Sequence, residues 1–347
     1  MPLIKYKRVV FNDERELIVR HSIRLLKQYT DAGYRPTLRQ LYYRFVALDL
    51  FPDRWADKET GSKNNDRSYA KLKEIMVDAR MAGRVDWLAM DDITRILRGN
   101  QHWAGPVDAL SDRARKFRLD RWVESEHRLE VWVEKDAMIG PVARAAMEKD
   151  VDYFSCRGYG SATALWEAGQ RLKSYCQCGQ TPMVFHLGDH DPSGLDMSRD
   201  IQERVRMFMD GYGGDLEFER LALNIDQIRR YNPPPSPAKV TDSRYQGYIA
   251  KFGKYCWELD SLEPEVIHKI ILDAIDPYVD TKKWQASERE EGILRTDMVD
   301  VAHHWQGDVM KAITKIREKI REDAKRKKAR RNSTKKENGN GRRKKRP

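Results

Sequence analysis

The N-terminal part of the chain carries hydrophobic positions at helical spacing. In residues 14–32, the side chains of one stripe recur every three or four positions, which predicts an amphipathic helix that ends before Gly33. The stripe consists of Leu17, Ile18, His21, Leu25 and Leu26. This segment is therefore expected to bury one face against a neighbouring element.

A second helix is expected to open at Thr37, directly after Pro36. Thr37 and Gln40 have the spacing of a capping box, in which a hydroxyl and a Gln side chain satisfy free backbone amides at the start of a helix. The stripe that this helix would bury consists of Leu38, Leu41, Phe45 and Leu48.

A third helix is predicted from about residue 67 to Met81, before Gly83, and the segment RVDWLAM (residues 84–90) then reads as a strand or wing. Helices followed by a short strand are the order of a winged helix-turn-helix, which docks on DNA in many proteins. A small helical domain without nucleic acid has the same order, so the pattern alone leaves both interpretations open.

From Leu129 onward, apolar runs of strand length alternate with helical patterns. The alternation predicts a parallel sheet with crossover helices, so the expected fold class is mixed α/β. The Pro-rich segment 231–248 is expected to be an ordered loop because tyrosines are spread through it, and strand and helix return in residues 251–276. Strands are expected to begin the segments 129–138, 151–161 and 181–194, and helices to fill 141–150, 161–175 and 194–209.

Acidic side chains stand where two of these strands end. Glu134 closes the run EVWVE, and Asp189 and Asp191 flank His190 after the strand at residue 181. Residues i and i+2 of an extended segment point to the same side, and two close carboxylates repel unless a cation lies between them. Carboxylate ligands on a tight turn suit Mg²⁺. The alternatives are a helix N-cap with a solvated acid and, for His190, a structural position facing the other way.

The positive charge is concentrated at the C-terminus. Of the net charge of +11, residues 325–347 contribute 13 basic residues minus 1 acidic residue, or +12, and the rest of the chain is 52 minus 53, or −1. Such a segment is expected to be disordered and to attract polyanions, or only to keep the protein in solution. The residues predicted to contact DNA are Lys325, Arg326, Lys327, Lys328, Arg330 and Arg331.

Composition argues against several classes of protein. The sequence has no apolar run of 18 residues and no apolar signal segment near its start, so neither a membrane span nor secretion is expected. The four cysteines form no CxxC pair, which argues against a zinc ribbon and favours reduced thiols. These features predict a cytoplasmic protein, associated with the nucleoid if it binds DNA.

The spacing of Glu134 from the later Asp189–Asp191 pair resembles the Toprim domain of topoisomerases, bacterial primases and related nucleases. The resemblance implies that these three carboxylates bind Mg²⁺ and act on phosphodiesters. Lys135 and Arg157 are expected either to contact phosphate or to be solvated.

The stretch RQLYY (residues 39–43) adds a second likeness. It resembles the Arg-x-x-Tyr/Phe-Tyr motif of the topoisomerase VI A subunit and the related meiotic double-strand-break transesterase, with Gln40 where that family usually has an acidic residue. The segments CRGYGSATALW, LALNIDQIRRYNPPPSPAK and WELDSLEP also resemble parts of that family. The chain is close to an A subunit in size and shows no ATPase motif such as a P-loop, so it looks most like the stand-alone Mini-A group.

This resemblance implies a Mg²⁺-dependent, type IIB topoisomerase-like transesterase in which Tyr43 attacks DNA and forms a 5′-phosphotyrosyl link. A phenol with a pKa near 10 is a poor nucleophile without help. Arg39, one helical turn earlier, would stabilise the phenolate or neutralise a phosphate oxygen. The family further implies a homodimer on duplex DNA, with the tyrosine of one protomer beside the acidic site of the other.

The expected organisation is a winged-helix domain with the catalytic tyrosine (1–125), a Toprim domain with a C-terminal extension (126–324) and a basic tail (325–347). Tyr42 is expected to pack in the core, and Glu258 to form a structural salt bridge. A hydrolytic Toprim endonuclease of the plasmid or phage defence type and a DNA-binding protein that needs a partner to cleave are the alternatives. An ATPase B-type partner, resealing and DNA sequence preference are left open.

Overall fold

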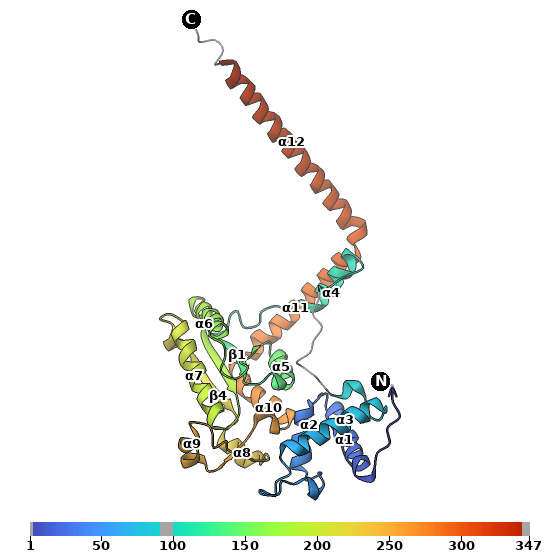
Figure 1. Ribbon diagram of the computed structural model, residues 1–347. Helices are drawn as coiled ribbons and strands as arrows, with labels where there is room; N and C mark the ends of the chain where they lie inside the picture. The colour runs from blue at the N-terminus through green and yellow to red at the C-terminus, as the bar shows by residue number, and fades with distance from the viewer. Residues whose placement is uncertain (1–2, 91–99, 342–347) are drawn as a thin grey trace. The chain divides into compact units, whose positions relative to one another are not determined.

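The computed structural model describes residues 3–90 and 100–341, and it divides into two compact units (Figure 1). The first unit comprises Met1–Leu97 and Arg121–Val279, and the second comprises Arg98–Asp120 and Asp280–Pro347. These units differ from the boundaries expected from sequence. The N-terminal helices and the sheet share one unit, whereas the helix at Pro106–Lys116 packs with a helix that lies far later in the chain.

Three α-helices form the N-terminal part of the first unit: α1 (Asp13–Asp31), α2 (Leu38–Ala47) and α3 (Asp66–Met81). The predicted capping box of α2 is confirmed, because Gln40 N donates to Thr37 Oγ1 at 3.3 Å and Thr37 N donates to Gln40 Oε1 at 2.8 Å. Most of the predicted stripes meet in one core, whose fully buried members include Ile18, Leu25, Leu41, Phe45 and Leu72. Leu17 and Leu48, which were expected in these stripes, are exposed instead.

The strand or wing expected at residues 84–90 is wrong. Trp87–Ala89 form a short 3-10 helix, because the Asp86 side chain accepts a hydrogen bond from Leu88 N at 2.9 Å and turns the chain. A second 3-10 helix lies at Asp53–Trp55. Residues 3–90 contain no strand, so the structure does not confirm a winged helix here.

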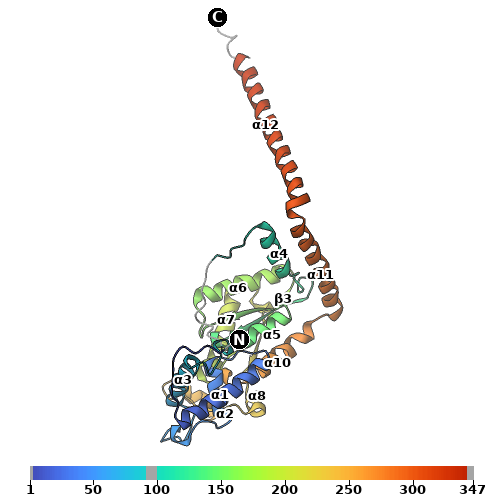
Figure 2. The same cartoon turned by 90° about the vertical axis from the view of Figure 1, so that its right-hand side faces the viewer.

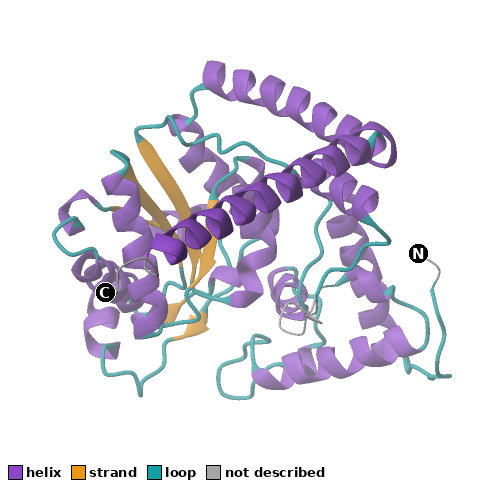
Figure 3. Ribbon diagram, turned by 90° about the horizontal axis from the view of Figure 1, so that it is seen from above, coloured by secondary structure: helices purple, strands orange, loops and turns teal. Residues whose placement is uncertain are grey.

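The central sheet has four parallel strands in the order β2-β1-β3-β4. Its strands are drawn in orange in Figure 3. Helices α6 (Ala162–Gln177) and α7 (Pro192–Phe208) lie on one side of it, and α5 (Ile139–Glu148) and α10 (Pro264–Ile275) on the other. The predicted mixed α/β fold with a parallel sheet is confirmed. The strands are β1 (His127–Val133), β2 (Asp152–Ser155), β3 (Thr181–Leu187) and β4 (Glu217–Ala222).

The Pro-rich segment after α8 (Ile225–Tyr231) is ordered, as expected. Ser236–Pro237 (β5) pair with Tyr255–Cys256 (β6) as a short antiparallel ladder, and α9 (Tyr245–Phe252) lies between them in the chain. The next residues, a 3-10 turn at Leu259–Ser261, lead into α10. The segment after α8 thus returns at residues 257–260 to the carboxyl ends of the sheet strands.

Polar contacts fix the N-terminal helices to the rest of the first unit. Tyr29 on α1 donates to Glu263 at 2.8 Å, and Arg44 on α2 forms an ion pair with the same carboxylate at 2.5 Å. Arg144 on α5 donates to the carbonyl of Gly33 at 2.8 Å. The orientation of α2, which carries Arg39 and Tyr43, is therefore set by its neighbours in the same chain.

In the second unit, α4 (Pro106–Lys116) packs along α11 (Thr281–His303). The buried Glu291 joins them, accepting from Leu119 N and Arg118, each at 3.0 Å. After a π-helical turn at Trp305–Val309, α12 runs from Met310 to Gly341 (Figure 2). Most of the segment expected to be disordered is thus helical in its backbone, in line with the good helix propensity of Ala, Lys and Arg.

Candidate active site

The carboxyl ends of β1 and β3 bring Glu134 and Asp189 together, as the sequence predicted. Asp189 N donates to Glu134 Oε2 at 2.9 Å, and Glu134 N donates to the carbonyl of Leu187 at 2.9 Å. Gly188 makes this approach possible, because a Cβ atom there would lie 2.8 Å from Glu134 Oε2. The two carboxylates are buried, with 6% of Glu134 and 5% of Asp189 exposed.

The helix N-cap that the sequence offered as one interpretation of the acidic turn is present at Asp191. Its carboxylate caps α7, accepting a hydrogen bond from Gly194 N at 2.6 Å. It also lies close enough to Glu134 to raise the pKa of that residue. Gly194 is required by the tight turn, since a Cβ atom there would meet the Asp189 carbonyl oxygen at 2.3 Å.

His190 is structural, as one of the interpretations expected. Its Nδ1 lies 2.9 Å from Tyr248 Oη, and its backbone pairs with Trp257 in both directions at 2.8 and 3.0 Å. Burial lowers the pKa of His190 to about 4, so the imidazole is neutral near pH 7. It therefore belongs to the packing behind the acidic turn.

A partly buried arginine on the neighbouring strand holds the backbone of the same turn. Arg220, near the end of β4, donates to the carbonyl oxygens of Gly188 at 3.0 Å and Gly194 at 3.1 Å. Burial lowers its pKa to about 10. Arg220 was not predicted from sequence, where nothing distinguishes it from the arginines of solvated surfaces.

Arg39 and Tyr43 lie one turn apart on α2, as their spacing predicts. Arg39 Nη2 donates to Tyr43 Oη at 3.2 Å. Only 4% of Tyr43 is exposed, and burial raises the pKa of its phenol, with Asp260 and Glu258 adding to the effect. Tyr42 packs edge-on against Tyr43 and donates to Asn64 at 3.0 Å, which confirms its expected place in the core.

Glu258 and Asp260, hereafter the acid pair, connect the tyrosine to the acidic turn. Arg39 binds Glu258, and its Nε lies 3.0 Å from Asp260 Oδ2. Lys135 Nζ lies 2.6 Å from Asp189, 3.0 Å from Glu258 and 3.7 Å from Asp260. The salt bridge expected of Glu258 is confirmed, and Lys135 contacts carboxylates. Asp260 was missed, because two acids in WELD give no sign of their distant partners.

Negative charge is in excess across this cluster. With every group ionised, the five carboxylates Glu134, Asp189, Asp191, Glu258 and Asp260 outnumber the cations Arg39, Lys135 and Arg220 by five minus three, or two negative charges.

Burial, with the neighbouring acids, raises the pKa of Glu134 and of Asp260 to about 7 each. Burial would raise the pKa of Glu258 too, but Lys135 and Arg39 lower it to about 2.

Hard carboxylate oxygens with surplus negative charge fit a divalent cation such as Mg²⁺. Glu134, Asp189 and Asp191 are the residues that would hold it. The buried oxygens of Asp260 have no hydrogen-bond donor among the described residues and are neutralised only by the ion pairs with Arg39 and Lys135. Over that same part of the chain, no three potential ligands form a ready-made metal cage.

The remaining predicted residues lie outside this cluster. Arg157 is exposed and pairs with Asp136 at 2.9 Å. Lys325 and Arg326 are exposed on α12. The side chains of Lys327, Lys328, Arg330 and Arg331 lie outside the described residues.

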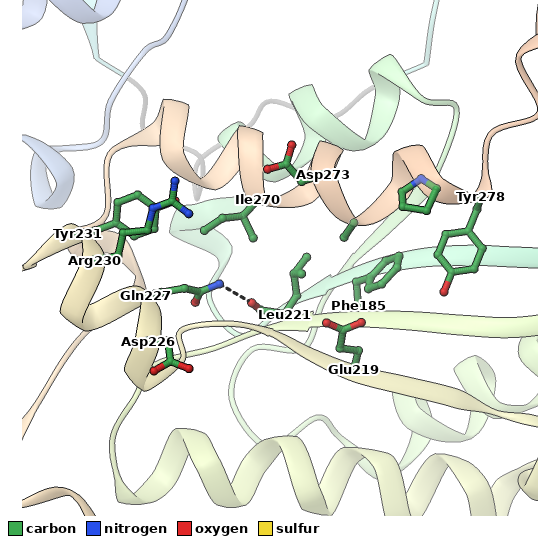
Figure 4. Close-up of a pocket in the computed structure, with 12 residues that line it drawn as sticks. Phe185, Glu219, Leu221, Asp226, Gln227, Arg230, Tyr231, Ile270, Asp273 and Tyr278 are labelled. Atoms are coloured by element: carbon green, nitrogen blue, oxygen red, sulfur yellow. Dashed lines mark hydrogen bonds between the residues drawn. The ribbon is translucent and has the colours of Figure 1, made fainter.

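A pocket of about 570 Å³ lies on the α10 side of the sheet (Figure 4). Its apolar floor includes Phe185 and Leu221, and three carboxylates stand around it. Two of these are already paired along their own helices, Asp226 with Arg229 at 3.1 Å and Asp273 with Lys269 at 2.9 Å. The predicted site residues do not line this pocket, so the chemistry argued from sequence belongs to the strand ends.

No helix among the described residues has the length and apolar character needed to cross a membrane. Comparisons of the chain with models of protein families, with curated proteins and with solved structures find no match.

Proposed function

We propose that this protein is a DNA-cleaving transesterase of the topoisomerase VI A type, with its parallel sheet as a Toprim domain and its N-terminal helices as the DNA-docking part. One observation carries the proposal. A tyrosine hydroxyl is linked to a carboxylate site at the strand ends through the continuous contacts Tyr43–Arg39–Glu258–Lys135–Asp189.

In the proposed reaction the Tyr43 oxygen attacks a phosphodiester phosphorus. The new bond is the 5′-phosphotyrosyl ester, and the P–O3′ bond breaks. The proton lost by the Tyr43 hydroxyl is balanced by the one gained by the leaving oxygen, which is released as a 3′-hydroxyl. The guanidinium of Arg39 neutralises a non-bridging phosphate oxygen during attack. Glu134, Asp189 and Asp191 would hold Mg²⁺, which supplies charge stabilisation at the scissile phosphate and the leaving oxygen when bound.

A hydrolytic endonuclease on the same scaffold is the second candidate, and the burial of Tyr43 favours it. A phenol that is 4% exposed and has a raised pKa keeps its proton and is shielded from a substrate. Water would then replace the tyrosine as nucleophile, while the carboxylate site would keep its role. Transesterification instead requires that some of the residues that bury Tyr43 move aside, so that DNA can reach its hydroxyl.

Trapping a covalent adduct on supercoiled DNA separates the candidates. Denaturing wild-type reactions that contain Mg²⁺ should yield protein-linked DNA, and Tyr43→Phe should lower that yield at least about a hundredfold, since no other group replaces the nucleophile. Tyr42→Phe, which removes the neighbouring hydroxyl, is the matched control and should keep most of the adduct.

Other outcomes identify the alternatives. Free ends without adduct, equal in wild type and Tyr43→Phe and lost in Glu134→Ala or Asp189→Ala, would establish hydrolysis and reject the transesterase. DNA retention without Mg²⁺, and no cleavage under any condition, would indicate a binding protein that needs a partner.

The proposed partner is duplex DNA, with the basic residues of α12 as the contact. Cutting both strands requires two tyrosines, so a homodimer is part of the proposal. Sedimentation of the protein with and without DNA measures its stoichiometry. An ATPase subunit would be needed only if strand passage is coupled to nucleotide hydrolysis.

A further inference from the structure

The segment that carries the acid pair is attached to the acidic turn through its backbone. Trp257 exchanges two backbone hydrogen bonds with His190, at 2.8 and 3.0 Å. Leu259 N donates to Asp189 Oδ1 at 2.8 Å. Glu258 and Asp260 are therefore held in register with the carboxylates that would bind Mg²⁺.

Each side chain of the acid pair forms ion pairs with two cations. Three donors converge on the single oxygen Glu258 Oε2: Arg39 Nε at 3.2 Å, Arg39 Nη2, and Lys135 Nζ at 3.0 Å. Asp260 is fully buried and adds Arg39 at 3.0 Å on one oxygen and Lys135 at 3.7 Å on the other. Arg39 and Lys135 thus share the same two negative charges.

Each of these cations also contacts a second group outside the acid pair. Lys135 Nζ lies 2.6 Å from Asp189, beside the place where a metal would bind that carboxylate. Arg39 Nη2 donates to Tyr43 Oη. With a divalent cation held by Asp189, the Lys135 ammonium would be repelled from that carboxylate and would turn more fully to the acid pair, which would weaken the hold of the pair on Arg39.

We propose that Glu258 and Asp260 are positioning residues that couple occupation of the Asp189 site to the surroundings of the Tyr43 hydroxyl, through exchange of Lys135 and Arg39 on the acid pair. This inference rests on the proposed function, because it takes Asp189 to be a Mg²⁺ ligand. It adds a role that the three metal-binding carboxylates lack. Without the cation, Arg39 is shared between the acid pair and Tyr43. With it, the acids would hold Arg39 less, and the guanidinium would be freer to interact with Tyr43 or a substrate phosphate.

Fluorine NMR of the full chain, with 3-fluorotyrosine in place of tyrosine, tests the coupling without DNA or activity. Tyr43→Phe identifies the Tyr43 resonance, and Mg²⁺ is then titrated while calorimetry measures its binding. In the wild-type protein the Tyr43 resonance should move in step with Mg²⁺ binding. In Glu258→Gln and in Asp260→Asn, that movement should fall to less than about half, because the shared charge is removed.

Glu263→Gln is the matched control. Glu263 is a carboxylate of the same segment and pairs with Arg44, on the same helix as Arg39, at 2.5 Å. Its removal should leave the Mg²⁺-dependent movement of the Tyr43 resonance unchanged. Since Asp260 is fully buried and its variant is the one at risk of misfolding, Glu258→Gln is the decisive variant, with thermal unfolding as the check on its fold.

The failures of the two proposals are distinguishable. If wild-type protein binds Mg²⁺ but the Tyr43 resonance stays in place, or moves equally in Glu258→Gln, the coupling is wrong and the proposed function is untouched. If the wild-type protein binds no Mg²⁺, both proposals fall together.

Discussion

At the scale of single residues, burial decides how the carboxylates of the site behave. Glu134 follows the last residue of a buried strand, and both the loss of water and the nearby Asp189 raise its pKa from 4.5 to about 7. Glu258 has the opposite shift, because Lys135 and Arg39 outweigh its burial. Two acids of one type, some hundred residues apart, are therefore tuned in opposite directions by their neighbours.

The raised pKa of Glu134 predicts a pH-dependent cost to folding. Between pH 4.5 and about 7 the folded state binds more protons than the unfolded state, so stability is lost as the pH rises through this window. Glu134→Gln removes the ionisation and keeps an oxygen to accept the hydrogen bond from Asp189 N. It should raise the free energy of unfolding at pH 8 by about 1–3 kcal/mol, and by much less at pH 4.

Denaturant unfolding of wild type and Glu134→Gln at the two pH values, without divalent cations, measures this difference. An equal change at pH 4 and pH 8 would mean that charge burial is not the cause.

At the scale of elements, the turn between β3 and α7 places the site. Asp189 follows the strand, and Asp191 caps the N-terminus of the helix. The backbone of the turn between strand and helix is packed with almost no free space around it. Gly194, in the first turn of α7, touches the backbone of Asp189 so closely that any side chain displaces it. The geometry of the carboxylates thus depends on a residue without chemistry of its own.

Gly194→Ala should therefore destabilise the protein by about 1–3 kcal/mol and weaken Mg²⁺ binding, because the turn must open to accommodate the methyl group. Gly247→Ala on α9 is the matched control. No atom lies within 4 Å of a Cβ atom at that position, so the change should be neutral or slightly stabilising.

Thermal unfolding and calorimetric Mg²⁺ titration of the two variants supply the comparison. If Gly194→Ala binds Mg²⁺ as well as Gly247→Ala does, the close packing of the turn does not control the site.

At the scale of the whole molecule, the net positive charge lies in the C-terminal segment and not in the rest of the chain. The chain up to residue 324 is nearly neutral, at −1, whereas residues 325–347 carry +12. A carboxylate site with surplus negative charge does not attract DNA by itself, so a basic segment would supply the attraction and the acidic site the chemistry.

Neutralising the six predicted DNA contacts should therefore weaken duplex binding without lowering the unfolding temperature. Each lost phosphate contact lowers the magnitude of the slope of log affinity against log salt by about 0.9. Fluorescence anisotropy over a series of KCl concentrations measures this slope, and a variant with Lys and Arg exchanged at the same positions is the control. The six positions changed to Gln are Lys325, Arg326, Lys327, Lys328, Arg330 and Arg331.

An unchanged slope in the Gln variant would place the DNA contacts elsewhere. A fall in unfolding temperature would show that this part of α12 contributes to the fold.

The sequence by itself determined the elements and the acids at their ends. Hydrophobic period and cap residues are local properties, so the helices at Asp13–Asp31 and Leu38–Ala47 and the strand ends at Glu134 and Asp189 could be predicted. Prediction from the local pattern failed at two segments whose residue types fit more than one structure. An Asp86 side chain bends RVDWLAM into a turn, and good helix formers extend α12 through a segment whose charge suggested disorder.

Only the tertiary structure determined which charged side chains form ion pairs with one another. Arg39 and Glu258 are 219 positions apart, and their contact depends on how α2 packs against the segment after β6. Burial of Tyr43 and Asp260, and with it their raised pKa values, follows from the same packing. No local pattern carries this information, because desolvation and ion pairing are set by neighbours in space rather than in sequence.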